Sequence, residues 1–195
     1  AVWNAAIRAQ LIMLTPFAPH FAEEQWEMLG EQPFISLEPW PSYKEEDIDT
    51  NILAMQSLVN AVVDDVRQVF KLAKIDRPHK TTIIISDDWK YEFFSLLTEQ
   101  LRVTRNVNEI IPIIMASPLK AHGGDIMKML PRLVKQNALP PHILSAELEH
   151  EALTQALDFL ESELGTKVEV VLAKDISSHH KARQASPGKP AIIVE

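Results

Sequence analysis

The sequence predicts a mainly helical α+β protein, in which the remnant of a helical bundle is followed by a small domain with a three-stranded sheet and several helices. Apolar residues recur every three or four positions over most of residues 1–75, which is the spacing of amphipathic helices. Three short runs rich in β-branched residues follow, at residues 80–86, 167–173 and 190–194, and these predict strands. Apolar residues make up 46% of the 195 residues and charged residues 24%, which is ordinary globular composition.

The first part of the chain is predicted to hold two helices and an irregular segment. Residues 2–14 have apolar side chains on more than one face, and the Thr-Pro pair that follows ends this helix. A second helix covers residues 19–29, with proline in its first turn and glycine after its end. Residues 31–47 contain three prolines and show no periodicity. We expect this segment to lie over the bundle with three apolar side chains buried: Phe34, Ile35 and Trp40.

The strongest helical pattern in the chain covers residues 49–74. Its apolar residues at spacings of three and four predict one core-facing stripe: Ile52, Met55, Val59, Val62, Val66, Val69 and Ala73. This helix could finish the bundle or open the next domain. We therefore divide the chain into the end of the bundle (1–48), a connecting helix of ambiguous assignment (49–75) and a terminal domain (76–195).

The terminal domain is predicted to alternate between strands and helices. After the strand at 80–86, Ser86 or Asp87 can cap a helix that begins near residue 88. Further helices are expected at 107–115, 126–136 and 146–164. Ser145 is placed to cap the last of these, and Gly165 to end it. Residues 175–189, between the last two strands, are polar and basic with glycine and proline, and they predict a loop.

The charge distribution leaves two places where an anionic partner could bind. The net charge is −8, but residues 61–135 carry 12 basic and 9 acidic side chains. One basic group runs from the long helix into the first strand, and the other lies in the last loop. Their members are Arg67, Lys71, Lys74, Arg77 and Lys80, and then Lys181, Arg183 and Lys189. Basic residues also complement a helix C-terminus, and a basic loop is often only solvated, so both interpretations stay open.

The sequence contains no recognisable catalytic or metal-binding motif. There is no phosphate-binding glycine loop, no nucleophile elbow and no zinc-binding helix motif. The adjacent His179 and His180 are the best metal candidates, but a solvated loop is the simpler interpretation. We expect no catalytic residue, metal or cofactor in this chain. Cysteine, a signal peptide and a long apolar stretch are absent, so we expect a cytoplasmic protein without a membrane partner. The opening in mid-helix without methionine predicts a fragment.

Three segments resemble the class Ia aminoacyl-tRNA synthetases for leucine, isoleucine and valine. They are PFAPHFAEEQWEMLG at 16–30, SLEPWP at 36–41 and DDVRQVFKLAKIDRPHKTTIII at 64–85. In that group these segments belong to the helical bundle that binds the anticodon-stem side of tRNA, and to the part that follows it. The resemblance therefore implies that the first part of this chain is the end of an anticodon-binding bundle.

The remainder is similar to the C-terminal domain of archaeal- and eukaryotic-type leucyl-tRNA synthetases. The matching segments are DDWKYEFFSLL, KMLPRLVKQ, ALDFLESELGTKVEVVLA and KPAIIVE. The resemblance implies that the final residues reach the long variable arm of tRNA(Leu), and the residues assigned to this role are Ile192, Val194 and Glu195. They are expected to act by packing and hydrogen bonding against unpaired bases, so few cations are needed.

The resemblance also implies what lies outside this chain. The HIGH-like and KMSKS-like catalytic motifs of the family do not occur here, so we expect the fragment to be inactive alone. ATP and Mg²⁺ are expected in the catalytic domain of the parent enzyme, and the other synthetase domains are expected partners. Two alternatives stay open: the corresponding fragment of an isoleucyl- or valyl-tRNA synthetase, and a helical module that docks a protein.

Overall fold

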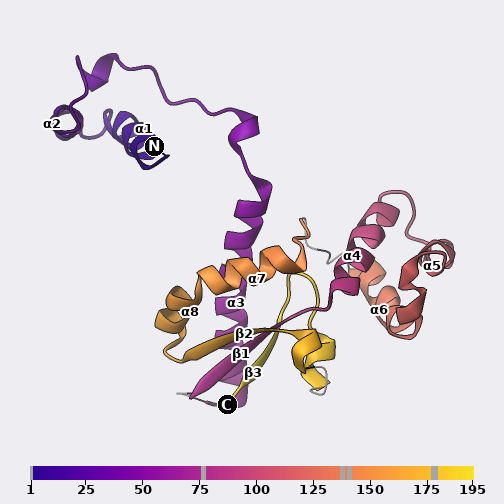
Figure 1. Ribbon diagram of the computed structural model, residues 1–195. Helices are drawn as coiled ribbons and strands as arrows, with labels where there is room; N and C mark the ends of the chain where they lie inside the picture. Colours follow the sequence, from indigo (N-terminus) through magenta and orange to yellow (C-terminus); the bar gives the residue numbers. More distant parts are fainter. Residues whose placement is uncertain (1, 76–77, 137–138, 140–141, 177–179) are drawn as a thin grey trace. The chain divides into compact units, whose positions relative to one another are not determined.

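The chain is described by a computed structural model that covers residues 2–75, 78–136, 139, 142–176 and 180–195. It is mainly helical with a three-stranded mixed sheet, which confirms the predicted fold class (Figure 1). Its internal contacts divide it into two units, Ala1–Ile48 and Asp49–Glu195, which are described separately.

The first unit is a pair of helices closed by an irregular segment. Its elements are α1 (Val2–Leu14), α2 (Pro19–Met28) and two 3-10 turns, η1 (Ile35–Leu37) and η2 (Glu45–Asp47). Its core is formed by Leu11, Ala22, Trp26 and Ile35. The Glu23 carboxylate accepts hydrogen bonds from the backbone N–H groups of Ile35 at 3.0 Å and Ser36 at 3.2 Å. These two bonds hold the start of η1 against α2.

The expectation that three apolar side chains of the irregular segment are buried is wrong for two of them. Ile35 is 1% exposed, whereas Phe34 is 60% and Trp40 is 62% exposed. Glu23 fixes the backbone at Ile35 and Ser36, and this places Ile35 in the core between α1 and α2. The extended residue before it then directs its side chain to the opposite side of the backbone.

The second unit begins with the long helix α3 (Thr50–Ala73). Asp49 caps it, because its carboxylate accepts hydrogen bonds from the N–H groups of Asn51 at 2.8 Å and Ile52 at 3.4 Å. The buried residues of α3 are Leu58, Val62, Val63 and Val66. The predicted stripe is therefore right in its middle and wrong at its ends, where Ile52 is 61% exposed and Ala73 is exposed. The apolar contacts of the helix with the rest of this unit extend from Ala54 to Phe70.

The sheet of the second unit has the strand order β2-β1-β3. Its strands are β1 (Lys80–Ile85), β2 (Lys167–Leu172) and β3 (Ala191–Val194). β1 is central and pairs parallel with β2, from Lys80 opposite Lys167 to Ile85 opposite Leu172. It pairs antiparallel with β3, from Thr81 opposite Val194 to Ile84 opposite Ala191. β3 is therefore an edge strand.

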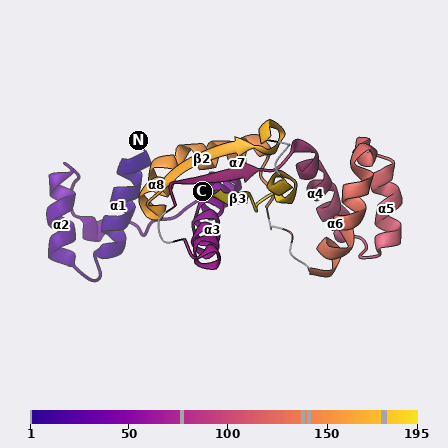
Figure 2. The same ribbon diagram turned by 90° about the horizontal axis from the view of Figure 1, so that it is seen from below.

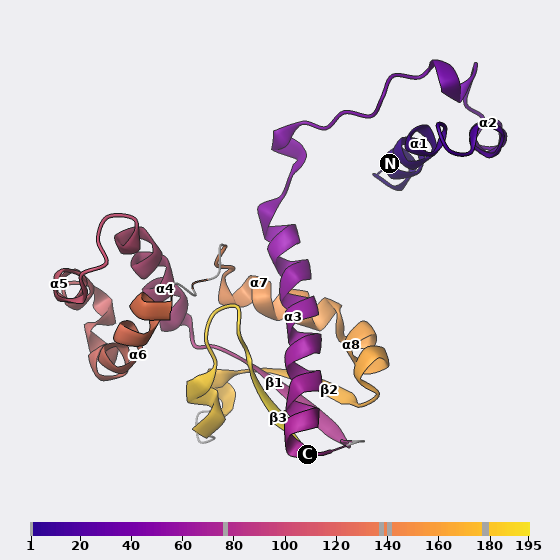
Figure 3. The same ribbon diagram turned by 180° about the vertical axis from the view of Figure 1, so that it is seen from behind.

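Helices cover one face of this sheet, and short turns cover the other. Ile83 and Ile85 of β1 pack in the same core as α3 and two further helices, α7 (Ala146–Gln155) and α8 (Leu157–Leu164). Ile84 points to the opposite face, where it packs against the turns η4 (Ala173–Ile176) and η5 (His180–Gln184). Seen from behind, α3 crosses the sheet and ends beside the C-terminus (Figure 3).

A group of helices inserted between β1 and α7 has a core of its own (Figure 2). Its elements are α4 (Asp88–Leu101), α5 (Val107–Met115), η3 (Pro118–His122) and α6 (Gly123–Gln136). The buried side chains of this core include Phe93, Leu97, Ile110 and Leu130. Tyr91 of α4 packs in the core beside the sheet instead, so this helix joins the two cores.

Three sequence predictions for this unit need correction. The helix expected over 146–164 breaks at Ala156, whose ψ of 6° leaves the helical range, and α8 then turns back onto β2. Neither Ser86 nor Asp87 caps α4 with its side chain, because Ser86 donates to the carbonyl of Ala185 instead, at 3.2 Å. The last loop contains η4 and η5, and Ala182 and Ala185 are buried in it.

Candidate nucleic-acid interface

β3 forms one of the two edges of the sheet, and this edge is called the open edge. Glu195, just after this strand, exchanges both backbone hydrogen bonds with Lys80: its N–H donates at 2.9 Å, and its carbonyl accepts at 3.2 Å. In an antiparallel pair, hydrogen-bonded and non-bonded positions alternate. Ile192 and Val194 occupy the non-bonded positions, so their N–H and C=O groups point away from β1, to the open side.

The three residues assigned to tRNA contact from the resemblance differ in exposure. Ile192 is partly buried and packs against the core beneath α3. Val194 is partly buried, and the side chain of Glu195 is exposed. At the end of the chain the backbone groups of Val194 thus point away from β1, the carbonyl of Ile192 accepts a hydrogen bond from Lys181, and the side chain of Glu195 is exposed.

The loop before β3 places basic side chains at the start of this strand. The Lys181 ammonium donates a hydrogen bond to the carbonyl oxygen of Ile192, at 2.9 Å. Arg183 and Lys189 are exposed. Of the two histidines considered as metal ligands, His179 lies outside the described residues. Within the described part of the chain, no group of three His, Cys, Asp or Glu residues is arranged to hold a metal ion.

A basic hollow of about 550 Å³ lies at the end of α3, and it contains part of the first basic group. The residues that line it are Arg67, Phe70, Lys71, Lys74 and Ile75. Arg67 is paired with Glu163 of α8 at 2.6 Å, whereas Lys71 and Lys74 are exposed. Lys74 ends the helix in the left-handed conformation, with a φ of 55°.

The other members of that group are not brought to the hollow. Lys80 pairs with Glu169 of β2 at 2.8 Å, and the hydrogen bond and charge of Glu169 raise the pKa of Lys80 above its usual value. Arg77 lies outside the described residues. Of the five predicted residues, the hollow therefore contains three: Arg67, Lys71 and Lys74.

The basic hollow and the basic loop flank opposite ends of β3. The N–H of His79 donates to the carbonyl of Glu195 at 2.8 Å, so the segment just before β1 meets the end of β3. α3 contacts β3, and the C-terminus and the end of α3 overlap when the molecule is seen from the front and from behind (Figures 1 and 3). The loop that holds Lys181, Arg183 and Lys189 enters β3 at its other end. Cations are thus present at both ends of the open edge.

A buried polar network that the sequence did not predict joins α4 and α7 to this loop. Lys90 is 3% exposed and donates to the carbonyls of Arg183 at 2.8 Å and Ala185 at 2.6 Å. Glu149 is 1% exposed and accepts from the Tyr91 hydroxyl at 2.8 Å and the Gly188 N–H at 2.6 Å. In the sequence, this network was indicated only by Lys90, a charged residue between the aromatic residues Trp89 and Tyr91.

Burial governs the ionisation of this network. It lowers the pKa of Lys90, against the opposing effects of Asp87 and Asp125. It raises the pKa of Glu149, and the hydrogen bonds from Gly188 and Tyr91 offset this only in part. Burial and the adjacent Glu149 carboxylate also raise the pKa of Tyr91, which keeps this hydroxyl protonated as a donor.

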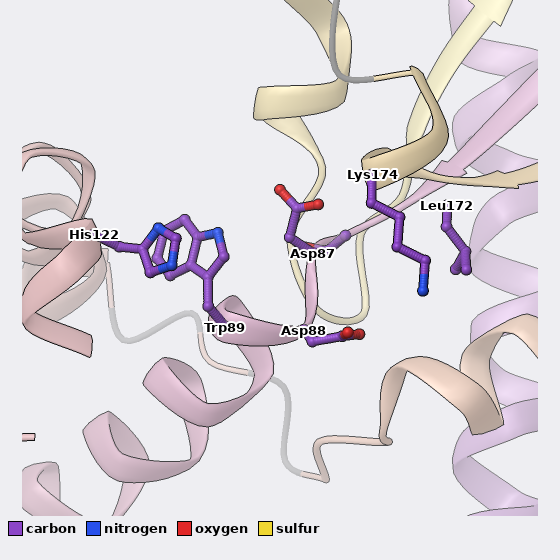
Figure 4. A pocket seen from close by; sticks show the side chains of 7 residues that line it. Asp87, Asp88, Trp89, His122, Leu172 and Lys174 are labelled. Atoms are coloured by element: carbon purple, nitrogen blue, oxygen red, sulfur yellow. The ribbon is translucent and has the colours of Figure 1, made fainter. Parts of the chain in front are cut away.

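A second hollow, of about 350 Å³, lies at the carboxyl ends of β1 and β2 (Figure 4). Asp87, Asp88 and Lys174 line it, so its charge is mixed. The indole of Trp89 stacks on the imidazole of His122 with the ring centres 4.4 Å apart. One face of the indole is therefore already covered, and the two carboxylates make this hollow unsuited to phosphate.

Comparison with known proteins identifies the chain. Residues 1–85 match the family described as the anticodon-binding domain of tRNA ligase. This match covers the whole first unit and continues through α3 and β1 of the second. The first 85 residues are therefore similar to the anticodon-binding domain of tRNA ligases.

Three archaeal proteins that are similar to this chain are all leucine–tRNA ligases. The chain is 36% identical over 184 residues to the leucine–tRNA ligase of Methanocaldococcus jannaschii. It is 32% identical to that of Pyrococcus furiosus and 30% identical to that of Pyrococcus horikoshii, each over 183 residues. These matches cover 94% of the chain and 18% of each relative.

The chain is thus similar over almost its whole length to a part of the archaeal leucine–tRNA ligases, which supports its interpretation as a C-terminal fragment of such an enzyme. The resemblance inferred from residues 16–41 and from the ending of the sequence is confirmed. The comparisons favour neither the isoleucine and valine enzymes nor a protein-docking module. In the described residues, no helix is long and apolar enough to cross a membrane.

Proposed function

We propose that this chain is the tRNA-binding part of a cytoplasmic leucine–tRNA ligase, and that it reads the long variable arm of tRNA(Leu). The intact enzyme ligates leucine to this tRNA, using ATP and Mg²⁺ in a catalytic domain outside this chain. The role of the chain is to position the tRNA and to select it.

The observation that carries this proposal is the open edge of β3. Unpaired RNA bases are distinguished by hydrogen bonds to their edges, and the N–H and C=O groups of an edge strand form a fixed row of donors and acceptors. Val194 directs such groups to the open side. The exposed Glu195 carboxylate is an acceptor, which suits the amino groups of unpaired bases.

The positions of the basic residues support the same proposal. Recognition of the bases themselves needs few basic side chains. The phosphates on either side of these bases are negatively charged, however, and basic side chains are needed to bind them. Lys71 and Lys74 lie toward one end of β3, and Arg183 and Lys189 toward the other. An RNA strand that crosses the edge would meet cations before and after it, although the chain carries a net charge of −8.

Deletion of residues 190–195 from the full-length enzyme tests this function. We expect kcat/KM for charging tRNA(Leu) to fall at least tenfold, while leucine-dependent pyrophosphate exchange, which reports amino-acid activation, stays within twofold. A tRNA(Leu) with a shortened variable arm serves as the control substrate, and its charging should change little on deletion. Equal losses with both tRNAs, or no loss with either, would rule out reading of the arm.

A further inference from the structure

The loop that leads into β3 is held by hydrogen bonds from the side chain of Lys90 in α4. The ammonium of Lys90 donates to two carbonyls of this loop, those of Arg183 and Ala185, and Ser86 donates to the second of them. Lys90 is 3% exposed and has no ion-pair partner within hydrogen-bonding distance among the described residues. Its charge is therefore stabilised by these two carbonyls together with the nearby carboxylates of Asp87 and Asp125.

Glu149 holds the same loop three residues further on. Residues 186–189 form a tight turn, in which Ser186 and Lys189 exchange backbone hydrogen bonds at 2.9 Å and 3.1 Å. Gly188 has a φ of 71°, a conformation that favours glycine, and its N–H points at the Glu149 carboxylate. Tyr91, next to Lys90 in α4, donates to the other oxygen of this carboxylate.

A buried lysine and a buried glutamate that bind backbone groups cost stability, because neither charge is hydrated and they do not pair with each other. Both side chains contact the segment that runs from η5 to β3, and the contacted residues lie five positions or fewer apart along the chain. Their common effect is on the place and register of β3, which has only four residues.

We propose that Lys90 and Glu149 are positioning residues for RNA recognition, which hold the loop 183–188 so that β3 presents its open edge to the variable arm. This inference rests on the proposed function. Without either contact, β3 is presented correctly in only a fraction of the molecules, and the apparent Kd for the tRNA rises by the inverse of that fraction.

The test uses the full-length enzyme with Lys90→Met and Glu149→Leu, which keep the side-chain size and remove the buried charge. Glu149→Gln keeps an oxygen that accepts from Gly188. Thr98→Val is the matched control, because it removes a hydrogen bond within α4, to the carbonyl of Phe94, and touches no residue of the loop. The Kd is measured for tRNA(Leu) and for tRNA(Leu) with a shortened arm, together with pyrophosphate exchange.

We expect Lys90→Met and Glu149→Leu to raise the Kd for tRNA(Leu) about tenfold and to leave the Kd for the shortened tRNA and pyrophosphate exchange unchanged. Glu149→Gln should restore most of the affinity, and Thr98→Val should behave as the unmodified enzyme. Equal losses for both tRNAs would show a general structural defect and overturn the inference. If deletion of 190–195 weakens binding but the two variants do not, the inference fails and the proposed function stands. If the deletion has no effect, both fail.

Discussion

The ammonium of Lys181 donates a hydrogen bond to the carbonyl oxygen of Ile192 across the open side of the sheet, at 2.9 Å. A side chain of the loop thus occupies a position where a further strand would bind. It holds β3 from its unpaired side, and it places a positive charge beside the groups that we propose to read RNA.

Replacement of Lys181 by methionine, compared with the same replacement of Lys189, should separate the effect of the hydrogen bond to β3 from the effect of the positive charge. We expect faster hydrogen exchange of the backbone amides of residues 191–195, because one contact to the edge strand is lost, and a several-fold weaker affinity for tRNA(Leu). Lys189→Met removes an equal charge from an exposed side chain of the same loop and should leave the exchange of 191–195 unchanged. Equal exchange in both variants would show that the bond to Ile192 does not hold the strand.

The basic hollow should contribute to affinity through salt-dependent phosphate contacts. The double variant Lys71→Gln with Lys74→Asn removes two charges, and asparagine tolerates the left-handed conformation of residue 74. We expect the slope of log K against log salt to become less negative by about 1 to 2, because each phosphate contact contributes about 0.7 to 0.9. Arg105→Gln, an exposed charge in the α4–α6 group, is the control. An unchanged slope would exclude the hollow from the interface.

The raised pKa of Glu149 predicts a pH-dependent stability. Burial raises this pKa above the usual 4.5, so the stability that the group contributes is complete below 4.5 and is lost as the pH rises through the folded-state pKa. Glu149→Gln removes the titration. The free energy of unfolding of this variant, relative to the unmodified chain, should therefore increase with pH across that window, by at most about 1.4 kcal/mol per pH unit. Urea unfolding followed by circular dichroism from pH 4 to pH 7 measures this difference, and a constant difference would contradict the assignment.

The cap of the long helix gives a prediction about stability alone. Asp49→Ala leaves the N–H groups of Asn51 and Ile52 without their acceptor and should lower the free energy of unfolding by about 1 kcal/mol. Asp49→Asn keeps an acceptor oxygen and should cost only a few tenths of that value. Denaturant unfolding of the two variants provides the measurement, and equal losses would show that the charge of Asp49 matters more than its hydrogen bonds.

Local patterns were sufficient to predict most elements of the fold. Three of these patterns depend only on neighbouring residues: the helical period of α3, the isoleucine run of β1, and the Ser145 and Gly165 signals around α7 and α8. The elements that they predicted begin and end within a residue or two of the expected positions. The break at Ala156 was not predictable, because it depends on how α8 packs against β2. Nor was the exposure of Trp40, which has no local sequence signature.

The sequence suggested a location for the candidate site, which stays a prediction, but it did not indicate the contacts there. Clustered charge indicated the end of α3 and the last loop, and the resemblance indicated the final residues. The pairing of Lys80 with Glu169 joins residues on different strands, and the Tyr91–Glu149–Gly188 contacts join three distant segments. Contacts of this kind follow from the sheet topology, which a single sequence does not specify.

The central position of β1 has a consequence for how the chain folds. Its residues pair with two segments that are synthesised much later, since Lys80 lies opposite Lys167 and Thr81 opposite Val194. Helices can form as the chain emerges, but Ile83, Ile84 and Ile85 have no strand neighbour until β2 is available, and both neighbours are present only after β3 has been made. During this interval the isoleucine run is the surface most prone to aggregation, and a chaperone that shields extended apolar segments would bind there first.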